Sequence, residues 1–157
     1  MAEVQQDIHM AEVQQDIQDI LAGNAFTLHN FIEAESVERD RAVFRLDVRP
    51  ESKNPYGIVH GSALYTLADN ATGVAACTDG RHYVTQNGSL NFLKNQTQGT
   101  IRAAAHVRHR GRSTCLVDVD ITGDNDVLLA TGQFTYFRVD IQIQKTEQSG
   151  ASGTKTL

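Results

Sequence analysis

The sequence predicts a single α+β domain in which an antiparallel sheet wraps around one long helix. Two observations predict this class: an alanine-rich, apolar helical pattern over residues 61–78, and the strand-like runs that precede and follow it. A third is the length of 157 residues, which is near the usual size of one domain. We therefore expect one domain over residues 10–143.

The chain begins with a direct repeat, in which "MAEVQQDIH" at residues 1–9 is followed by "MAEVQQDIQ" at residues 10–18. Nine residues rotate an α-helix by about 180° beyond whole turns, so Val4 and Val13 would face opposite sides of one helix. We interpret residues 1–9 as a duplicated start and an artefact. From Met10, apolar residues at helical spacing that end at Gly23 predict a short amphipathic helix.

The next segments predict a hairpin and a buried helix. Residues 25–48, "AFTLHNFIEAESVERDRAVFRLDV", are rich in strand formers around a charged turn near Arg39 and Asp40. A loop follows from Pro50 to Gly57. The pattern over residues 61–78 is the only other helix that we expect, and it is apolar almost all round, which indicates burial.

Four more strands are expected, over residues 82–93, 100–109, 113–122 and 127–138. Turn signals separate them, namely "KNQTQG", "RGR" and "GDND". The polar tail at residues 144–157 is rich in Ser, Gly and Thr and is expected to be disordered. A sheet with one helix on one side has free edges, so we expect dimerisation through a strand edge.

Composition excludes several classes of function. The net charge of −5 argues against a general nucleic-acid-binding surface. No apolar run approaches the ~20 residues of a membrane span, and the start lacks the pattern of a signal peptide. The two cysteines, Cys77 and Cys115, have no CxxC or metal-site spacing and resemble small core residues, so we expect no disulfide framework, no metal site and a cytoplasmic location.

An aspartate in the middle of the buried helix needs an explanation, because Asp is a poor helix-interior residue. Asp69 shares a polar or small stripe with Ser62, Thr66 and Gly73, at spacings of four, three and four residues. Asp69 is therefore expected to point at a cleft. The alternative is a structural role, as a cap or in an ion pair.

The start of the same helix favours a polarised carbonyl oxygen. His60 and Gly61 lie where unpaired N–H groups and the helix dipole attract negative charge, and Asn54 could add a side-chain amide. Gly61 and Asp69 are eight residues apart, or about 12 Å along a helix. One substrate carbon cannot contact both, so a site that uses both needs two subunits.

The motif N-x5-HG-x7-D, formed by Asn54, His60, Gly61 and Asp69, together with "LNFLKN" and "VRHRGRST", resembles the phenylacetyl-CoA thioesterase-like (PaaI-type) branch of the hotdog-fold thioesterases. The resemblance covers residues 54–137 and, more loosely, the chain from Met10. It implies five or six antiparallel strands around a helix, dimers that pair into homotetramers, and hydrolysis of acyl-CoA to free acid and CoA. The activity needs no cofactor.

The resemblance also implies roles for single residues. Asn54 and Gly61 would polarise the thioester carbonyl, His60 would shape that loop, and Asp69 from the partner would act as general base or nucleophile. Ser62 departs from the second glycine that many relatives have here.

The strand after the helix supplies, in that family, a polar residue that helps to hold the water. Thr85 is the best positional match, with Gln86 or Asn87 as the alternatives. Leu64, Tyr65 and Phe92 would line a pocket for aryl or medium-chain acyl groups.

The turn "RHRGRS" over residues 108–113 concentrates three arginines in an acidic chain, and guanidinium groups match phosphate geometry. The candidates for contact with the CoA nucleotide are Arg110, Gly111, Arg112 and Ser113. A solvated hairpin is the alternative.

Two other functions stay open. The first is a hotdog hydratase or dehydratase, although the longer proline-containing loop of the acyl-carrier dehydratases is missing. The second is a module that binds acyl-CoA without turning it over, which would not need Asp69.

Overall fold

The computed structural model describes residues 2–143, with side chains from residue 10 onward. The expected disorder of the tail at 144–157 lies outside the described residues. The helices are α1 (Ala2–Gly23), α2 (Ala25–His29) and α3 (Gly61–Cys77). Two short 3-10 helices are η1 (Pro50–Ser52) and η2 (Asp124–Asp126). The strands are β1 (Ile32–Glu38), β2 (Arg41–Asp47), β3 (His82–Phe92), β4 (Thr100–Arg110), β5 (Thr114–Thr122) and β6 (Leu128–Val139).

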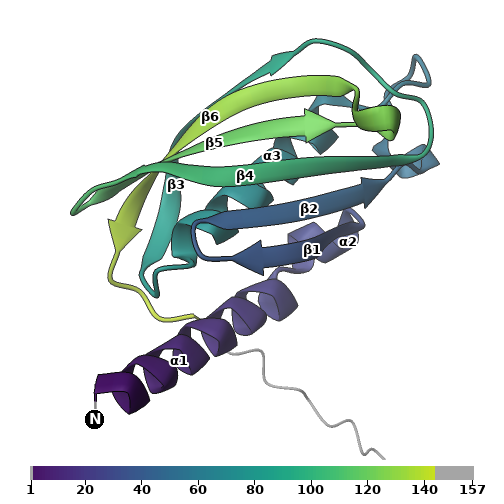
Figure 1. The fold of residues 1–157 in the computed structure, drawn as a ribbon. Helices are drawn as coiled ribbons and strands as arrows, with labels where there is room; N and C mark the ends of the chain where they lie inside the picture. Colours follow the sequence, from purple (N-terminus) through teal and green to yellow (C-terminus); the bar gives the residue numbers. More distant parts are fainter. Residues whose placement is uncertain (1, 144–157) are drawn as a thin grey trace, which may run out of the picture.

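The strands form one six-stranded sheet in the order β1-β2-β4-β5-β6-β3, and every neighbouring pair is antiparallel. The sheet curves around α3, as Figure 1 shows. This arrangement confirms the α+β class and the six predicted strands. It leaves β1 and β3 as the two edges.

The long helix is buried because its residues are small or apolar on almost every side. Leu67, Ala68, Ala71, Ala75 and Ala76 are fully buried against the concave face of the sheet. Alanine brings the helix axis close to the strands, and close packing of this kind supplies most of the stability of such a core. The prediction of a buried central helix is confirmed.

The amino-terminal helix is longer than the segment expected from Met10, since it begins at Ala2 and runs through the repeat boundary. Val13 and Ile17 are buried against the core, and their side chains hold the second half of α1 on the domain. The interpretation of residues 1–9 as a duplicated start stays a prediction. In residues 2–143 no helix has both the length and the apolar character to cross a membrane.

Residues 25–29 form helix α2, so the expectation of a strand there was wrong, and α3 is not the only helix after α1. Asn24 explains the difference, because its side-chain oxygen accepts a hydrogen bond from the Thr27 N–H at 3.1 Å and caps the helix. This local cap outweighs the strand propensity of Phe26 and Thr27. The predicted hairpin is correct from Ile32 onward, with its turn at residues 39 and 40.

Candidate active site

Helix α3 begins with a histidine that caps it. The Nδ1 atom of His60 accepts a hydrogen bond from the Ser62 N–H at 3.1 Å. The His60 carbonyl accepts from the N–H groups of Ala63 and Leu64, at 3.0 and 3.3 Å. Of the first four N–H groups of α3, only that of Gly61 has no partner within the described part of the chain. The Gly61 N–H, which the sequence predicted to polarise a carbonyl, is therefore free to donate to an acceptor.

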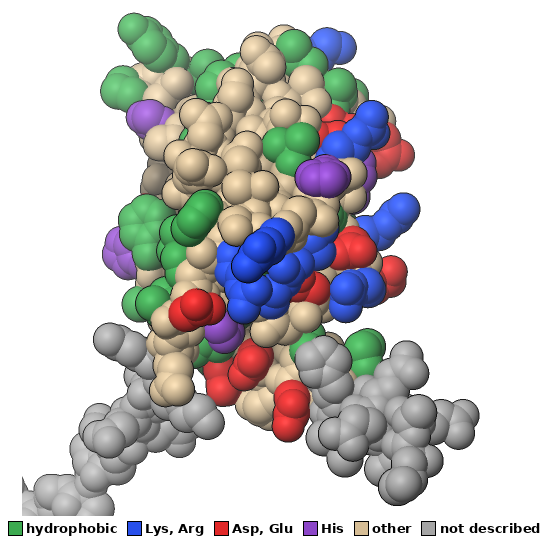
Figure 2. Space-filling view, turned by 90° about the vertical axis from the view of Figure 1, so that its left-hand side faces the viewer, with side chains coloured by type: hydrophobic (Ala, Val, Ile, Leu, Met, Phe, Trp, Pro, Cys, Tyr) green, Lys and Arg blue, Asp and Glu red, His purple; other side chains and the backbone are tan. Residues whose placement is uncertain are grey.

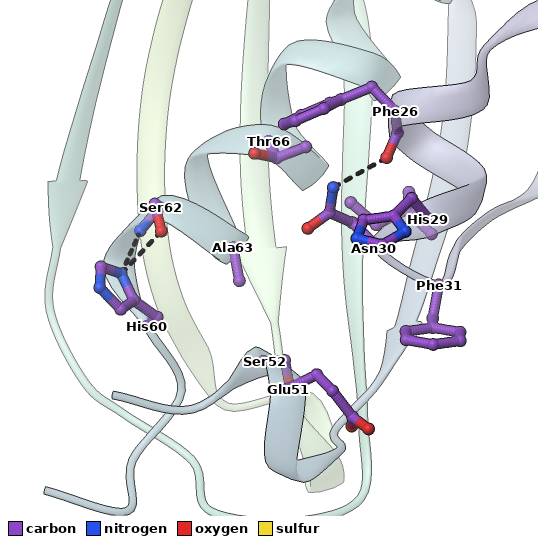
Figure 3. Close-up of a pocket in the computed structure, with 11 residues that line it drawn as sticks. Phe26, His29, Asn30, Phe31, Glu51, Ser52, His60, Ser62, Ala63 and Thr66 are labelled. Carbon is purple, nitrogen blue, oxygen red and sulfur yellow. Dashed lines mark hydrogen bonds between the residues drawn. The ribbon is translucent and has the colours of Figure 1, made fainter. Parts of the chain in front are cut away.

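A first cavity, of about 330 Å³, lies between this helix start and α2. Figure 3 shows His60 and Ser62 on one side of it and Phe26, His29 and Asn30 on the other. The Ser62 hydroxyl lies 2.7 Å from His60 Nδ1. Ser62 and Thr66, two members of the predicted polar stripe, line this cavity.

A second cavity, of about 380 Å³, contains Asp69 and Gly73, the other two members of the stripe. Two hydroxyl groups meet one oxygen of the Asp69 carboxylate. The Thr85 hydroxyl donates to Oδ1 at 2.8 Å, and the Tyr136 hydroxyl lies 2.9 Å from the same atom. Across residues 10–143, Oδ2 has no hydrogen-bond partner, so one carboxylate oxygen is held and the other is available.

A β-bulge in β3 brings Thr85 to this place. The register between β3 and β6 shifts between Thr85 and Asn87, so that Gln86 is the extra residue. Thr85 pairs with Tyr136 across the two strands, and both side chains reach Asp69. All three candidates on this strand are exposed, and only Thr85 has a hydrogen bond to the carboxylate.

Sequence reasoning missed Tyr136. Its hydroxyl lies 2.9 Å from both Oδ1 and the backbone carbonyl oxygen of Asp69, and 2.7 Å from the Thr72 hydroxyl. Burial, and then the negative charge of Asp69, raise the pKa of Tyr136 above its ordinary value. Alternation along β6 points Phe134 and Tyr136 inward, and a buried tyrosine hydroxyl needs a partner. That signal could have identified the residue but not its partner.

A small polar bridge links the N-terminal helices to α3. Asn70, next to Asp69, accepts hydrogen bonds at its side-chain oxygen from Asn24, at 3.0 Å, and from Thr27, at 2.5 Å. Asn24 and Ile20 also line the second cavity. The N-terminal segment therefore forms part of the wall around Asp69.

The other candidates near α3 are a loop residue, a core residue and two aromatic residues. The Asn54 side-chain oxygen accepts from the N–H groups of Tyr56 and Ile58, which fixes the loop before His60. Leu64 is 1% exposed and packs in the core, away from the pocket surface that we expected it to line. Tyr65 donates to the Gly88 carbonyl at 3.2 Å, and the Phe92 ring lies over Gly61.

Arg110 has a different position from the one expected for a nucleotide contact. Its guanidinium group donates to the Ala76 carbonyl at 2.6 Å, at the C-terminal end of α3. It also pairs with Asp40 at 2.7 Å and with Asp79 at 3.1 Å. The arginine side chain is only 13% exposed. The donors of Arg110 are thus directed into the protein, toward the end of α3, the β1–β2 turn and the segment that follows α3.

The other members of that turn lie on the surface. Arg112 and Ser113 are exposed, as is Arg108 next to them, and Gly111 donates its N–H to the Thr114 carbonyl to close the turn. Figure 2 shows Lys and Arg side chains gathered on this side of the molecule, with acidic side chains beside them.

The described residues 10–143 contain no group of three His, Cys, Asp or Glu side chains placed to hold a metal ion. Burial raises the pKa of Cys77 to about 11, which keeps this thiol protonated near neutral pH. Cys115 is fully buried. The second cavity thus holds a carboxylate with two hydroxyl partners, with His82 and the protonated Cys77 also in its lining.

Comparison with known proteins identifies the family of the chain. The Thioesterase superfamily matches residues 56–130, which contain Gly61, Asp69 and Thr85. The 1,4-dihydroxy-2-naphthoyl-CoA hydrolase of Listeria monocytogenes serotype 1/2a is 30% identical over 107 residues, 66% of this chain and 87% of that protein. The acyl-coenzyme A thioesterase PaaI of Escherichia coli K12 is 30% identical over 100 residues, 63% of this chain and 71% of that protein.

Among solved structures, a hypothetical thioesterase from Streptococcus pneumoniae TIGR4, crystallised with coenzyme A, is 32% identical with a TM-score of 0.66. The match covers 69% of this chain and 88% of that chain. Two mutant structures of that protein carry alanine in place of a threonine and of an aspartate, at positions 16 apart in its numbering. The chain described here belongs to the Thioesterase superfamily, as a hotdog-fold enzyme of the PaaI-like kind.

Proposed function

We propose that the protein hydrolyses acyl-CoA thioesters to a free acid and CoA, with Asp69 as general base or nucleophile. The observation that carries the proposal is the state of the Asp69 carboxylate: two hydroxyls hold Oδ1, Oδ2 has no partner among the described residues, and the side chain lines a cavity. A carboxylate oxygen that borders a cavity can accept a proton from a water molecule bound there.

The start of α3 supplies the complementary electrophilic group in this proposal. The free Gly61 N–H, at the positive end of the helix dipole, would donate to the thioester oxygen as negative charge develops on it. His60 would keep the helix start rigid through its cap, and Asn54 would order the loop or add its amide in the assembled enzyme.

Two subunits would have to share each site, because Gly61 and Asp69 lie about 12 Å apart on one helix. The edge strand β3 supports dimerisation. It is 11 residues long, lacks Lys, Arg, Asp and Glu, and exposes Val84 and Phe92. The opposite edge, β1, has three glutamates that would discourage pairing. We infer a β3-paired homodimer, which would assemble further into a tetramer.

The relatives support the same assignment. In the Streptococcus pneumoniae thioesterase the mutated aspartate and threonine have the same separation as Asp69 and Thr85, which are 16 residues apart here. The names of the two curated relatives describe one aryl-CoA and one general acyl-CoA substrate. An aryl or medium-chain acyl group suits the second cavity, where Ile20, Val74 and Val84 are apolar.

The test is free-thiol release from a panel of aryl, short-, medium- and long-chain acyl-CoA esters, with Asp69→Asn protein in parallel. We expect release by the wild type and a loss of about 100-fold or more in kcat for the mutant, because a positioned base contributes on this scale. A wild type that binds the esters without releasing thiol would contradict hydrolysis and favour a binding module. Hydration of enoyl-CoA by the wild type would favour hydratase chemistry instead.

A further inference from the structure

The Tyr136 hydroxyl has an unusual position for a tyrosine that belongs only to the core. Tyr136 is only 2% exposed, and its ring extends from β6 to the middle of α3. The hydroxyl ends beside the Asp69 carboxylate, at 2.9 Å from Oδ1, and it borders the second cavity. It therefore contacts the proposed base directly.

The two hydroxyl groups that contact Asp69 come from neighbouring positions in the sheet. Thr85 and Tyr136 are cross-strand partners, and both meet the same carboxylate oxygen, Oδ1. Hydroxyl donors to a carboxylate fix the plane of the group and favour its charged form. The lone pairs of Oδ2 are left for a proton that comes from outside the chain.

We propose that Tyr136 is a positioning residue for the hydrolysis reaction, which holds Asp69 Oδ1 together with Thr85 so that Oδ2 accepts the proton of the attacking water. This inference rests on the proposed function. It assigns Tyr136 no contact with substrate, and the effect of the tyrosine passes entirely through the orientation of Asp69.

Two further features support the donor role of the tyrosine. The Thr72 hydroxyl lies 2.7 Å from the Tyr136 oxygen and donates to the Ala68 carbonyl at 2.8 Å, so this contact holds the end of the phenol against α3 beside Asp69. Burial and the Asp69 charge raise the pKa of Tyr136, so the phenol stays protonated and can donate near neutral pH. The result is a chain of hydroxyl, hydroxyl and carboxylate that runs from α3 through β6 and back to α3.

Other ionisable side chains line the same cavity, namely Cys77 on α3 and His82 and Tyr83 on β3. Asp69 is the only carboxylate among the described residues that line this cavity.

The experiment measures kcat and KM of Tyr136→Phe with the best ester from the panel. Loss of a hydrogen bond to a charged group should lower kcat roughly tenfold or more with little change in KM. A role in binding or packing alone would instead raise KM or lower the melting temperature and leave kcat unchanged. Tyr56→Phe, which removes an exposed hydroxyl, is the matched control and should change neither quantity.

The outcomes separate this proposal from the proposed function. If the wild type releases no thiol, the proposed function fails. If the wild type is active and Tyr136→Phe keeps its kcat, or raises KM as much as it lowers kcat, the positioning role is overturned. If Tyr136→Phe does not fold, Thr72→Val decides, since it removes the partner of the phenol and should lower kcat by a smaller factor, again with KM unchanged.

Discussion

Two polar clusters flank α3, and they differ in how completely their atoms are satisfied. The Asp69 cluster consists of Asp69, Thr72, Thr85 and Tyr136, borders a cavity, and leaves Oδ2 without a partner among the described residues. The Arg110 cluster consists of Asp40, Asp79, Tyr83 and Arg110, lies at the end of the helix and is closed by ion pairs.

The difference separates a group that stabilises the fold from a group that can act on a ligand. Arg110 meets two helix carbonyls, two carboxylates and a phenol, so only its buried Nε has no partner in the part of the chain that the structure describes. A charged group with its capacity used internally stabilises the fold, whereas a carboxylate with unused capacity can act on a ligand. The following predictions test this distinction.

The largest effect should be on activity and should come from removing the Gly61 N–H, which the proposed site takes from the subunit opposite Asp69. Gly61→Pro removes only the free N–H, since proline is accepted at the first helical position and His60 already has extended backbone, with ψ at 135°. We expect a loss of about 100-fold or more in kcat, while Gly61→Ala, which keeps the N–H, stays active.

Mixing Gly61→Pro with Asp69→Asn subunits after reversible unfolding should then restore about one quarter of wild-type activity. Half of the random dimers are mixed, and each mixed dimer has one intact site. Thiol release before and after mixing measures this. Activity that stays absent in confirmed mixed dimers would show that the two groups do not act across the interface.

The next largest effect should be on stability, at the Arg110 cluster. Arg110→Ala leaves Asp79, whose side chain is only 4% exposed, without one of its cations, so we expect a loss of about 3 kcal/mol in the free energy of unfolding. Urea denaturation measures the change. Arg112→Ala, at an exposed side chain in the same turn, should change stability by less than about 0.5 kcal/mol. Equal losses would mean that the closed cluster has no special role.

A smaller effect concerns acid. Burial opposes ionisation of Asp79, but hydrogen bonds from the Arg81 backbone and side chain, with the charge of Arg110, outweigh it and lower the pKa of Asp79. A lowered pKa in the folded state stabilises the protein fully above the ordinary value near 4 and is lost as pH falls through the folded pKa.

Asp79→Asn should therefore flatten the dependence of the unfolding free energy on pH between about pH 5 and pH 2. Urea denaturation at several pH values across this range checks the slope. Asp140→Asn, at an exposed carboxylate, is the control and should keep the wild-type slope. An unchanged slope in Asp79→Asn would argue against the ion pair as the source of acid sensitivity.

The smallest effect should come from the exposed arginines of the same turn. Arg108→Gln with Arg112→Gln should raise KM for an acyl-CoA ester by roughly two- to fivefold at low salt, because exposed charges attract phosphates only weakly. The melting temperature and kcat should stay unchanged, and the KM difference should vanish at high salt. A KM equal to that of the wild type at low salt would remove these arginines from the CoA site.

The sequence by itself determined the architecture, because periodicity reports burial directly. The apolar pattern around Asp69 predicted the buried helix, and alternation predicted the strands to within a few residues. It also placed Gly61 at a helix start, where the orphan N–H groups follow from helix geometry alone. The short helix α2 was missed because the capping bond of Asn24 competes with strand propensity within only five residues.

Only the tertiary structure decided which of the polar candidates keep free capacity. Arg110 and Arg112 lie in one turn, yet one closes a buried cluster and the other meets solvent. Tyr136 contacts Asp69 from 67 residues away in the chain, through a register that the bulge at Gln86 sets. Hydrogen-bond satisfaction depends on which distant atoms meet, and no local pattern in the chain encodes that pairing.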